Sequence, residues 1–97
     1  MATIGKNFSI LLMEDEEDLG ETLQEVLEDE GYSVHWVKDG AEASNLSFKQ
    51  TFDLYVFDIN VPELNGLELL ESLRHAEDIT PTIFISAMID METMRKA

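Results

Sequence analysis

The sequence predicts a single α/β domain over residues 1–97, with a doubly wound parallel sheet between layers of helices. Strand-like apolar runs alternate along the chain with segments of helical periodicity, the order of right-handed βαβ units. The runs Phe8–Met13 and Leu54–Phe57 are apolar almost throughout, as strands buried on both faces are. The chain has 97 residues, 44% of them hydrophobic, which suits one core.

The first part of the chain predicts two strands around a long helix. Phe8–Met13 is the first strand. Apolar residues then recur at helical spacing over 16–30, and Gly31 stands where a C-terminal cap belongs. Tyr32–Val37 alternates between apolar and polar residues, which indicates a half-exposed strand at an edge of the sheet.

The second part continues the alternation. Asp39 and Glu42 have the spacing of a capping box and predict a helix that continues to about Lys49. Leu54–Phe57 is the third strand, and Pro62 prevents its continuation. The remaining expected elements are a helix over 67–76, a strand over Thr82–Ser86 and a fourth helix capped by Asp90.

The charge balance argues against two classes of partner. Twenty-one acidic residues against six basic ones give a net charge of −15, so this chain should repel nucleic acids and anionic membranes. There is no cysteine, which fits a reducing compartment, and no apolar run approaches membrane length. We expect a soluble cytoplasmic protein.

Acidic side chains follow two of the predicted strands. Glu14 and Asp15 come directly after the first strand, and Asp58 comes directly after the third. If these strands are parallel neighbours, three carboxylates meet at one edge of the sheet, where α/β proteins bind ligands. Oxygen ligands of this kind suit Mg²⁺, and an aspartate so placed can attack phosphorus to form an acyl phosphate.

Simpler explanations exist for each of these residues. The acidic run from Glu14 to Asp18 could be a solvated surface, and Asp58 before Asn60 could be ordinary turn chemistry. Ser86, taken alone, could be a strand-end hydroxyl that bonds to the backbone. The shared position of these residues at strand ends favours the functional interpretation.

Three segments in order resemble the receiver domain of two-component response regulators. They are Leu11–Glu17, Asp53–Pro62 and Ile83–Ala87, with Gly66 between the last two. The resemblance implies a flavodoxin-like sheet of order 2-1-3-4-5 and a signalling module rather than a turnover enzyme. It also implies phosphorylation by a histidine kinase or phosphotransfer protein.

The resemblance also implies roles for individual residues. Asp58 would be the phosphoacceptor and, with Glu14, Asp15 and the backbone carbonyl of Asn60, would hold Mg²⁺. Two residues, one at the end of the fourth strand and one directly after it, would serve the phosphoryl group. They are Ser86, as hydrogen-bond donor and switch, and Ala87, which leaves room for access.

The chain departs from the family pattern at its end. Val61 replaces a usual methionine, and the sequence stops at Ala97, inside the expected fourth helix. We therefore expect a truncated receiver of strand order 2-1-3-4, without the fifth strand, its lysine or the last helix. The strand Thr82–Ser86 would be an exposed edge able to form a homodimer by strand pairing or segment exchange.

Two alternatives to phosphotransfer stay open. One is a truncated receiver that cannot be phosphorylated and acts only as an interaction or dimerisation module. The other, a phosphatase with an aspartyl-phosphate intermediate, requires a second acid two residues after the nucleophile, where Asn60 stands.

Overall fold

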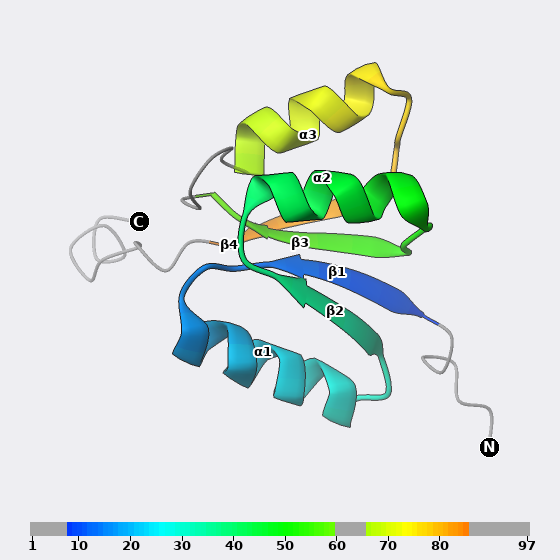
Figure 1. Cartoon of the computed structure of the whole chain (residues 1–97). Helices are drawn as coiled ribbons and strands as arrows, with labels where there is room; N and C mark the ends of the chain where they lie inside the picture. Colours follow the sequence, from blue (N-terminus) through cyan, green and yellow to red (C-terminus); the bar gives the residue numbers. More distant parts are fainter. Residues whose placement is uncertain (1–7, 60–65, 86–97) are drawn as a thin grey trace, which may run out of the picture.

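The computed structural model describes residues 8–59 and 66–85, in which four strands and three helices alternate (Figure 1). The elements are β1 (Ser9–Met13), α1 (Glu17–Asp29), β2 (Ser33–Val37), α2 (Gly40–Lys49), β3 (Leu54–Asp58), α3 (Gly66–His75) and β4 (Thr82–Ile85). The strands form one parallel sheet of order β2-β1-β3-β4, which confirms the predicted order. Within the described ranges, no helix is both long enough and apolar enough to cross a membrane.

The central strand β1 sets the register of the sheet. Its last residue, Met13, pairs with Val37 of β2 on one side and with Phe57 of β3 on the other. The strands therefore end at the same edge, and the residues that follow β1 lie beside the last residue of β3. This register brings distant parts of the sequence together.

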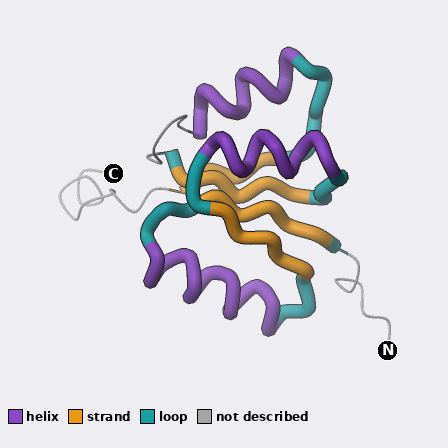
Figure 2. Tube along the Cα trace, in the orientation of Figure 1, coloured by secondary structure: helices purple, strands orange, loops and turns teal. Residues whose placement is uncertain are grey.

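Helices cover both faces of the sheet, α1 on one side and α2 with α3 on the other (Figure 2). Each face has its own core because neighbouring residues of a strand point to opposite sides. The core beneath α2 and α3 contains Leu11, Met13, Ala43, Phe52, Tyr55, Phe57, Leu69 and Leu73. The core on the α1 side contains Ile10, Leu12, Val34 and Val56.

The first helix begins and ends close to its predicted bounds. The side chain of Glu16 caps α1 by accepting a hydrogen bond from the backbone N–H of Leu19 at 2.8 Å. At the other end, Gly31 has φ of 102°, a left-handed conformation that glycine adopts without steric cost. The predicted helix terminus at Gly31 is therefore confirmed.

The capping box predicted for α2 is confirmed in one half. The Asp39 carboxylate accepts a hydrogen bond from the Glu42 N–H at 2.8 Å, as the motif requires. The Glu42 carboxylate, however, accepts from the N–H of Lys38 at 3.0 Å, one residue before the expected donor. The chain thus enters α2 with two donors satisfied.

Strand β4 lies at an edge of the sheet. Among the described strands it pairs with β3 alone, and the side chain of Ile83 is 51% exposed. The expected last residue of this strand, Ser86, and the helix predicted to begin at Asp90 lie outside the described residues. Self-association through β4 stays a prediction.

A polar network supports the buried end of Tyr55, which is 1% exposed. Its hydroxyl donates a hydrogen bond to the Asp78 carboxylate, which also accepts from the N–H of Thr80 at 3.0 Å. Burial, reinforced by the bond to Asp78, raises the pKa of Tyr55 to about 12. Burial raises the pKa of Asp78, but the hydrogen bonds from Thr80 and Tyr55 outweigh it and hold that pKa below its ordinary value.

We expect Tyr55→Phe to lower the free energy of unfolding by about 1–2 kcal/mol, because it removes a hydrogen bond to a charged acceptor. Urea unfolding followed by circular dichroism measures the change. Tyr32→Phe is a matched control, since the Tyr32 hydroxyl makes no hydrogen bond within the described ranges and its ring packs on Phe8. Equal effects of the two substitutions would show that the Tyr55 hydrogen bond does not stabilise the fold.

Self-association through β4 predicts dimers whose population rises with protein concentration, measured by sedimentation velocity. Ile83→Lys should shift the equilibrium toward monomer, because it places a charge on the exposed edge strand. Ile79→Lys is the control, since Ile79 is 81% exposed but precedes the strand. A compact monomer at high concentration would end this hypothesis.

Candidate metal and phosphoacceptor site

Two neighbouring strands deliver the acidic residues to one edge of the sheet. Glu14 directly follows β1, and Asp58 is the last residue of β3, next in sequence to the residue that pairs with Met13. Asp15 lies in the short connection from β1 to α1. The predicted meeting of these three side chains is confirmed.

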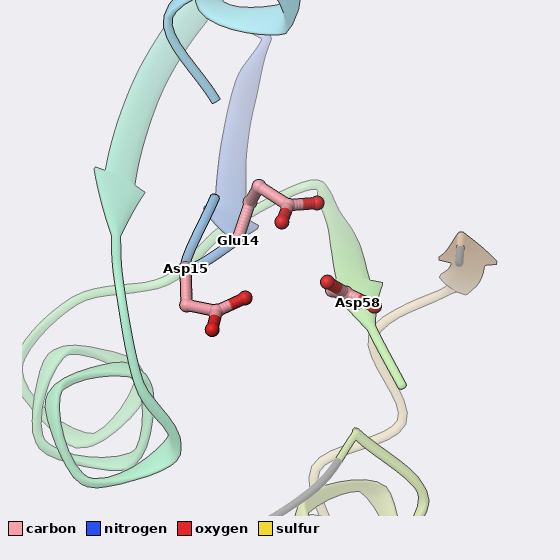
Figure 3. A group of neighbouring side chains, drawn as sticks. All are labelled: Glu14, Asp15 and Asp58. Atoms are coloured by element: carbon pink, nitrogen blue, oxygen red, sulfur yellow. The ribbon is translucent and has the colours of Figure 1, made fainter. Parts of the chain in front are cut away.

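The three carboxylates face a common space (Figure 3). Each offers one oxygen, and these oxygens all lie within 4.8 Å of one another. Glu14 is 0% exposed and Asp58 is 2% exposed, whereas Asp15 is exposed. The cluster is therefore buried on the sheet side and reaches solvent through Asp15.

Burial is the main electrostatic influence on Glu14. It raises the pKa of this carboxyl to about 7, against an ordinary value of 4.5. The backbone N–H of Glu16, which donates to Glu14 Oε2 at 3.0 Å, lowers the pKa in part. The Asp58 carboxyl raises the pKa through a side-chain hydrogen bond and through its charge, and Asp15 raises it through its charge, because like charges at short range disfavour ionisation.

The donor set fits a hard divalent cation such as Mg²⁺. Glu14 Oε1 is buried and has no hydrogen-bond partner among the described residues, which leaves a carboxylate oxygen available to a cation. The side chains of the cluster offer only oxygen ligands, which Mg²⁺ prefers over softer metals. A bound cation would also offset the repulsion among the carboxylates. The residues that would hold it are Glu14, Asp15 and Asp58.

Trp36 supports the site from β2, a role that sequence reasoning did not assign to it. Its indole Nε1–H donates a hydrogen bond to the backbone carbonyl of Glu14 at 2.8 Å. The ring of Trp36 also packs against the core on the α1 side. The one available signal was Gly20, a glycine within an otherwise regular helical pattern.

Gly66 supports Asp58 from the start of α3. A Cβ atom at Gly66 would lie 2.8 Å from the backbone carbonyl oxygen of Asp58 and 3.2 Å from the ring of Phe84. Its N–H donates to the carbonyl of Ile59 at 3.2 Å. The absence of a side chain thus lets α3 approach the end of β3 closely.

Three residues expected at the site lie outside the described residues: Asn60, Ser86 and Ala87. Their expected contributions, a backbone carbonyl for the metal, a hydroxyl for the phosphoryl group and space for its access, stay predictions.

Comparison with known families accounts for this arrangement. The sequence model of the response regulator receiver domain matches residues 10–97. The chain belongs to the receiver-domain family of two-component response regulators. The interpretation drawn from the three motifs is confirmed.

Curated response regulators are similar to this receiver domain along most of its length. Response regulator protein PmrA of Pseudomonas aeruginosa is 42% identical over 78 residues, which cover 80% of this chain and 35% of PmrA. Transcriptional regulatory protein CrdR of Helicobacter pylori is 39% identical over 89 residues, or 91% of this chain and 42% of CrdR. The chain thus spans about two fifths of these relatives or less.

Solved receiver domains share the fold. The receiver domain of Francisella response regulator 1452 superposes with a TM-score of 0.81 at 29% identity, covering 93% of this chain and 74% of that one. The response regulator TrrA of Thermotoga maritima, solved in complex with Mg²⁺-BeF, gives 0.78 at 32% identity, covering 82% and 70%. The receiver domain therefore has the expected flavodoxin-like fold.

The raised pKa of Glu14 predicts a pH-dependent stability for the metal-free receiver domain. An unfolded chain releases the Glu14 proton near 4.5, whereas the folded protein keeps it to about 7. Rising pH between these values therefore favours unfolding, and the free energy of unfolding should fall across this window. Urea titrations in the presence of a chelator measure it.

Glu14→Gln should remove that fall, since glutamine carries no proton to lose. Glu17→Gln is the control because its carboxylate has the opposite shift. A hydrogen bond from Lys38 holds the pKa of Glu17 below its ordinary value, so its contribution is lost as pH falls, not as it rises. A Glu14→Gln protein with an unchanged pH profile would refute the assignment to Glu14.

Proposed function

We propose that this receiver domain accepts a phosphoryl group on Asp58 from a histidine kinase or phosphotransfer protein, in a reaction that needs Mg²⁺. In this proposal it passes a signal by changing its own state and does not turn over a small molecule. The proposal rests on one observation above the others. Asp58 is almost fully buried at the end of a parallel strand, and one of its carboxylate oxygens lies within 4.8 Å of a carboxylate oxygen of each of two further acidic residues.

The position of Asp58 suits a nucleophile. Its carboxylate is carried by the last residue of a central strand, so the attacking oxygen is fixed relative to the sheet. One carboxylate oxygen would form a bond to phosphorus while the bond from phosphorus to the donor breaks. The donor group leaves with that electron pair, and the product is an acyl phosphate on Asp58.

Glu14 and Asp15 would serve the same reaction through the metal. With Mg²⁺ bound, its charge would offset both the carboxylates and the phosphoryl oxygens, which is the main requirement of phosphoryl transfer. We include the backbone carbonyl of Asn60 in this ligand set. Ser86 and Ala87 enter the proposal as the hydrogen-bond donor to the phosphoryl group and the small residue beside it.

The rival hypothesis is an interaction module that docks on a kinase or on another receiver without holding phosphate. It keeps the fold and the acidic cluster but forms no acyl phosphate. Metal uptake measured separately from phosphorylation distinguishes the two hypotheses.

Incubation with acetyl phosphate and Mg²⁺ should add one phosphoryl group per chain, seen by intact-mass spectrometry. Asp58→Asn should abolish this addition, because the amide is not a nucleophile toward phosphorus. Ser86→Ala should slow labelling by about tenfold or more, as expected when one hydrogen bond to the transferring group is lost.

Asp53→Asn is the matched control for Asp58→Asn. The Asp53 carboxylate lies near the start of β3, where it accepts a hydrogen bond from the Ser9 N–H at 2.8 Å, away from the acidic cluster. The Asp53→Asn protein should take up a phosphoryl group as the native protein does. Full labelling of the Asp58→Asn protein would disprove the phosphoacceptor assignment, and Mg²⁺ binding without any labelling of the native chain would favour the interaction module.

A further inference from the structure

Strand β2 forms hydrogen bonds with both backbone polar groups of Glu14, its N–H and its carbonyl. The Glu14 N–H donates to the carbonyl of Val37 at 3.0 Å. The Glu14 carbonyl accepts the indole hydrogen bond from Trp36 at 2.8 Å. The second bond extends the ladder beyond the last β1–β2 pair, with a side chain in place of a backbone donor.

The carbonyl that Trp36 contacts belongs to the peptide group between Glu14 and Asp15. Because a peptide group is planar, holding its oxygen also fixes the bond that leads to the Asp15 Cα atom. The Asp15 side chain is exposed and makes no hydrogen bond within the described ranges. Its direction toward Glu14 and Asp58 therefore depends on the backbone that carries it.

The indole is itself held in place by α1. A Cβ atom at Gly20 would lie 2.2 Å from Trp36 Cζ2 and 2.6 Å from Nε1, so the ring lies directly against the helix backbone. The ring also contacts a cation: the Lys38 Nζ atom lies 5.5 Å from the centre of the Trp36 ring and forms an ion pair with the Glu17 carboxylate at 2.6 Å. The donor is thus fixed by contacts outside the acidic cluster.

We propose that Trp36 is a positioning residue of the metal site, which fixes the Glu14–Asp15 peptide so that Asp15 points toward Glu14 and Asp58. This inference rests on the proposed function, since it assigns Asp15 as a metal ligand. The reason for such a device is the strict geometry of Mg²⁺, which tolerates little deviation from an octahedral arrangement of ligands. A ligand on a freely rotating peptide would bind it more weakly.

The test removes the indole donor and keeps the ring. Trp36 is the sole tryptophan of the chain, so a tryptophan auxotroph supplied with β-(3-benzothienyl)alanine replaces this residue alone. Mg²⁺ affinity, measured by isothermal titration calorimetry, should fall about three- to tenfold, the range expected for one lost hydrogen bond. Trp36→Phe, which also lacks the donor, should show a loss at least as large.

A second measurement reports on the hydrogen bond directly. The single indole N–H peak in a ¹H–¹⁵N NMR spectrum of the native protein should shift as Mg²⁺ is added, with the midpoint found by calorimetry. Tyr55→Phe is the control, because it removes a hydrogen bond to Asp78 and leaves the Trp36 donor intact. It should lower stability without lowering Mg²⁺ affinity.

The outcomes separate this inference from the proposed function. Native protein that binds Mg²⁺, with unchanged affinity after loss of the donor, would overturn the role of Trp36 and leave the phosphoacceptor site standing. An indole peak that does not move on saturation with Mg²⁺ would also overturn it. Native protein that takes up no Mg²⁺ would overturn the metal site and the inference with it.

Discussion

Repulsion among three carboxylates is the constraint on which the site depends. Parallel pairing of β1 with β3 brings Glu14 and Asp58 to the same edge, and both are almost fully buried there. Charged groups avoid such places unless another charge or a donor compensates them. One backbone N–H, from Glu16, partly compensates Glu14. The fold thus places unfavourable charges where a divalent cation would relieve them.

The rest of the structure holds that arrangement firm. Strand β1, which leads directly into Glu14, and strand β3, which ends at Asp58, lie in the middle of the sheet, with packed side chains on both faces. Gly66 lets α3 pack against the backbone of Asp58, while the indole of Trp36 holds the backbone of Glu14. Both strand ends are therefore supported by neighbouring elements, and the exposed side of the cluster is left to Asp15.

Much of this could be predicted from the sequence because it follows from periodicity and chain order. Apolar runs located the strands, and carboxylates directly after two of them located the site. The contacts of Trp36 and Gly66 could not be predicted in this way. Each joins a side chain or a bare Cα to a distant backbone carbonyl, and such contacts leave no periodic pattern. The capping box predicted the wrong donor to Glu42 by one residue: the N–H of Lys38 donates, not that of Asp39. Local turn geometry selects among adjacent N–H groups, and the sequence pattern does not show which one it selects.

The contact between Gly20 and Trp36 links two positions that are sixteen residues apart. No side chain fits at position 20 while the indole lies against it, and a smaller ring at position 36 would leave a gap beside the helix. The two positions are thus a single unit for protein engineering. A graft of this acidic cluster onto another α/β scaffold would have to carry the glycine along with the tryptophan, although neither is a ligand.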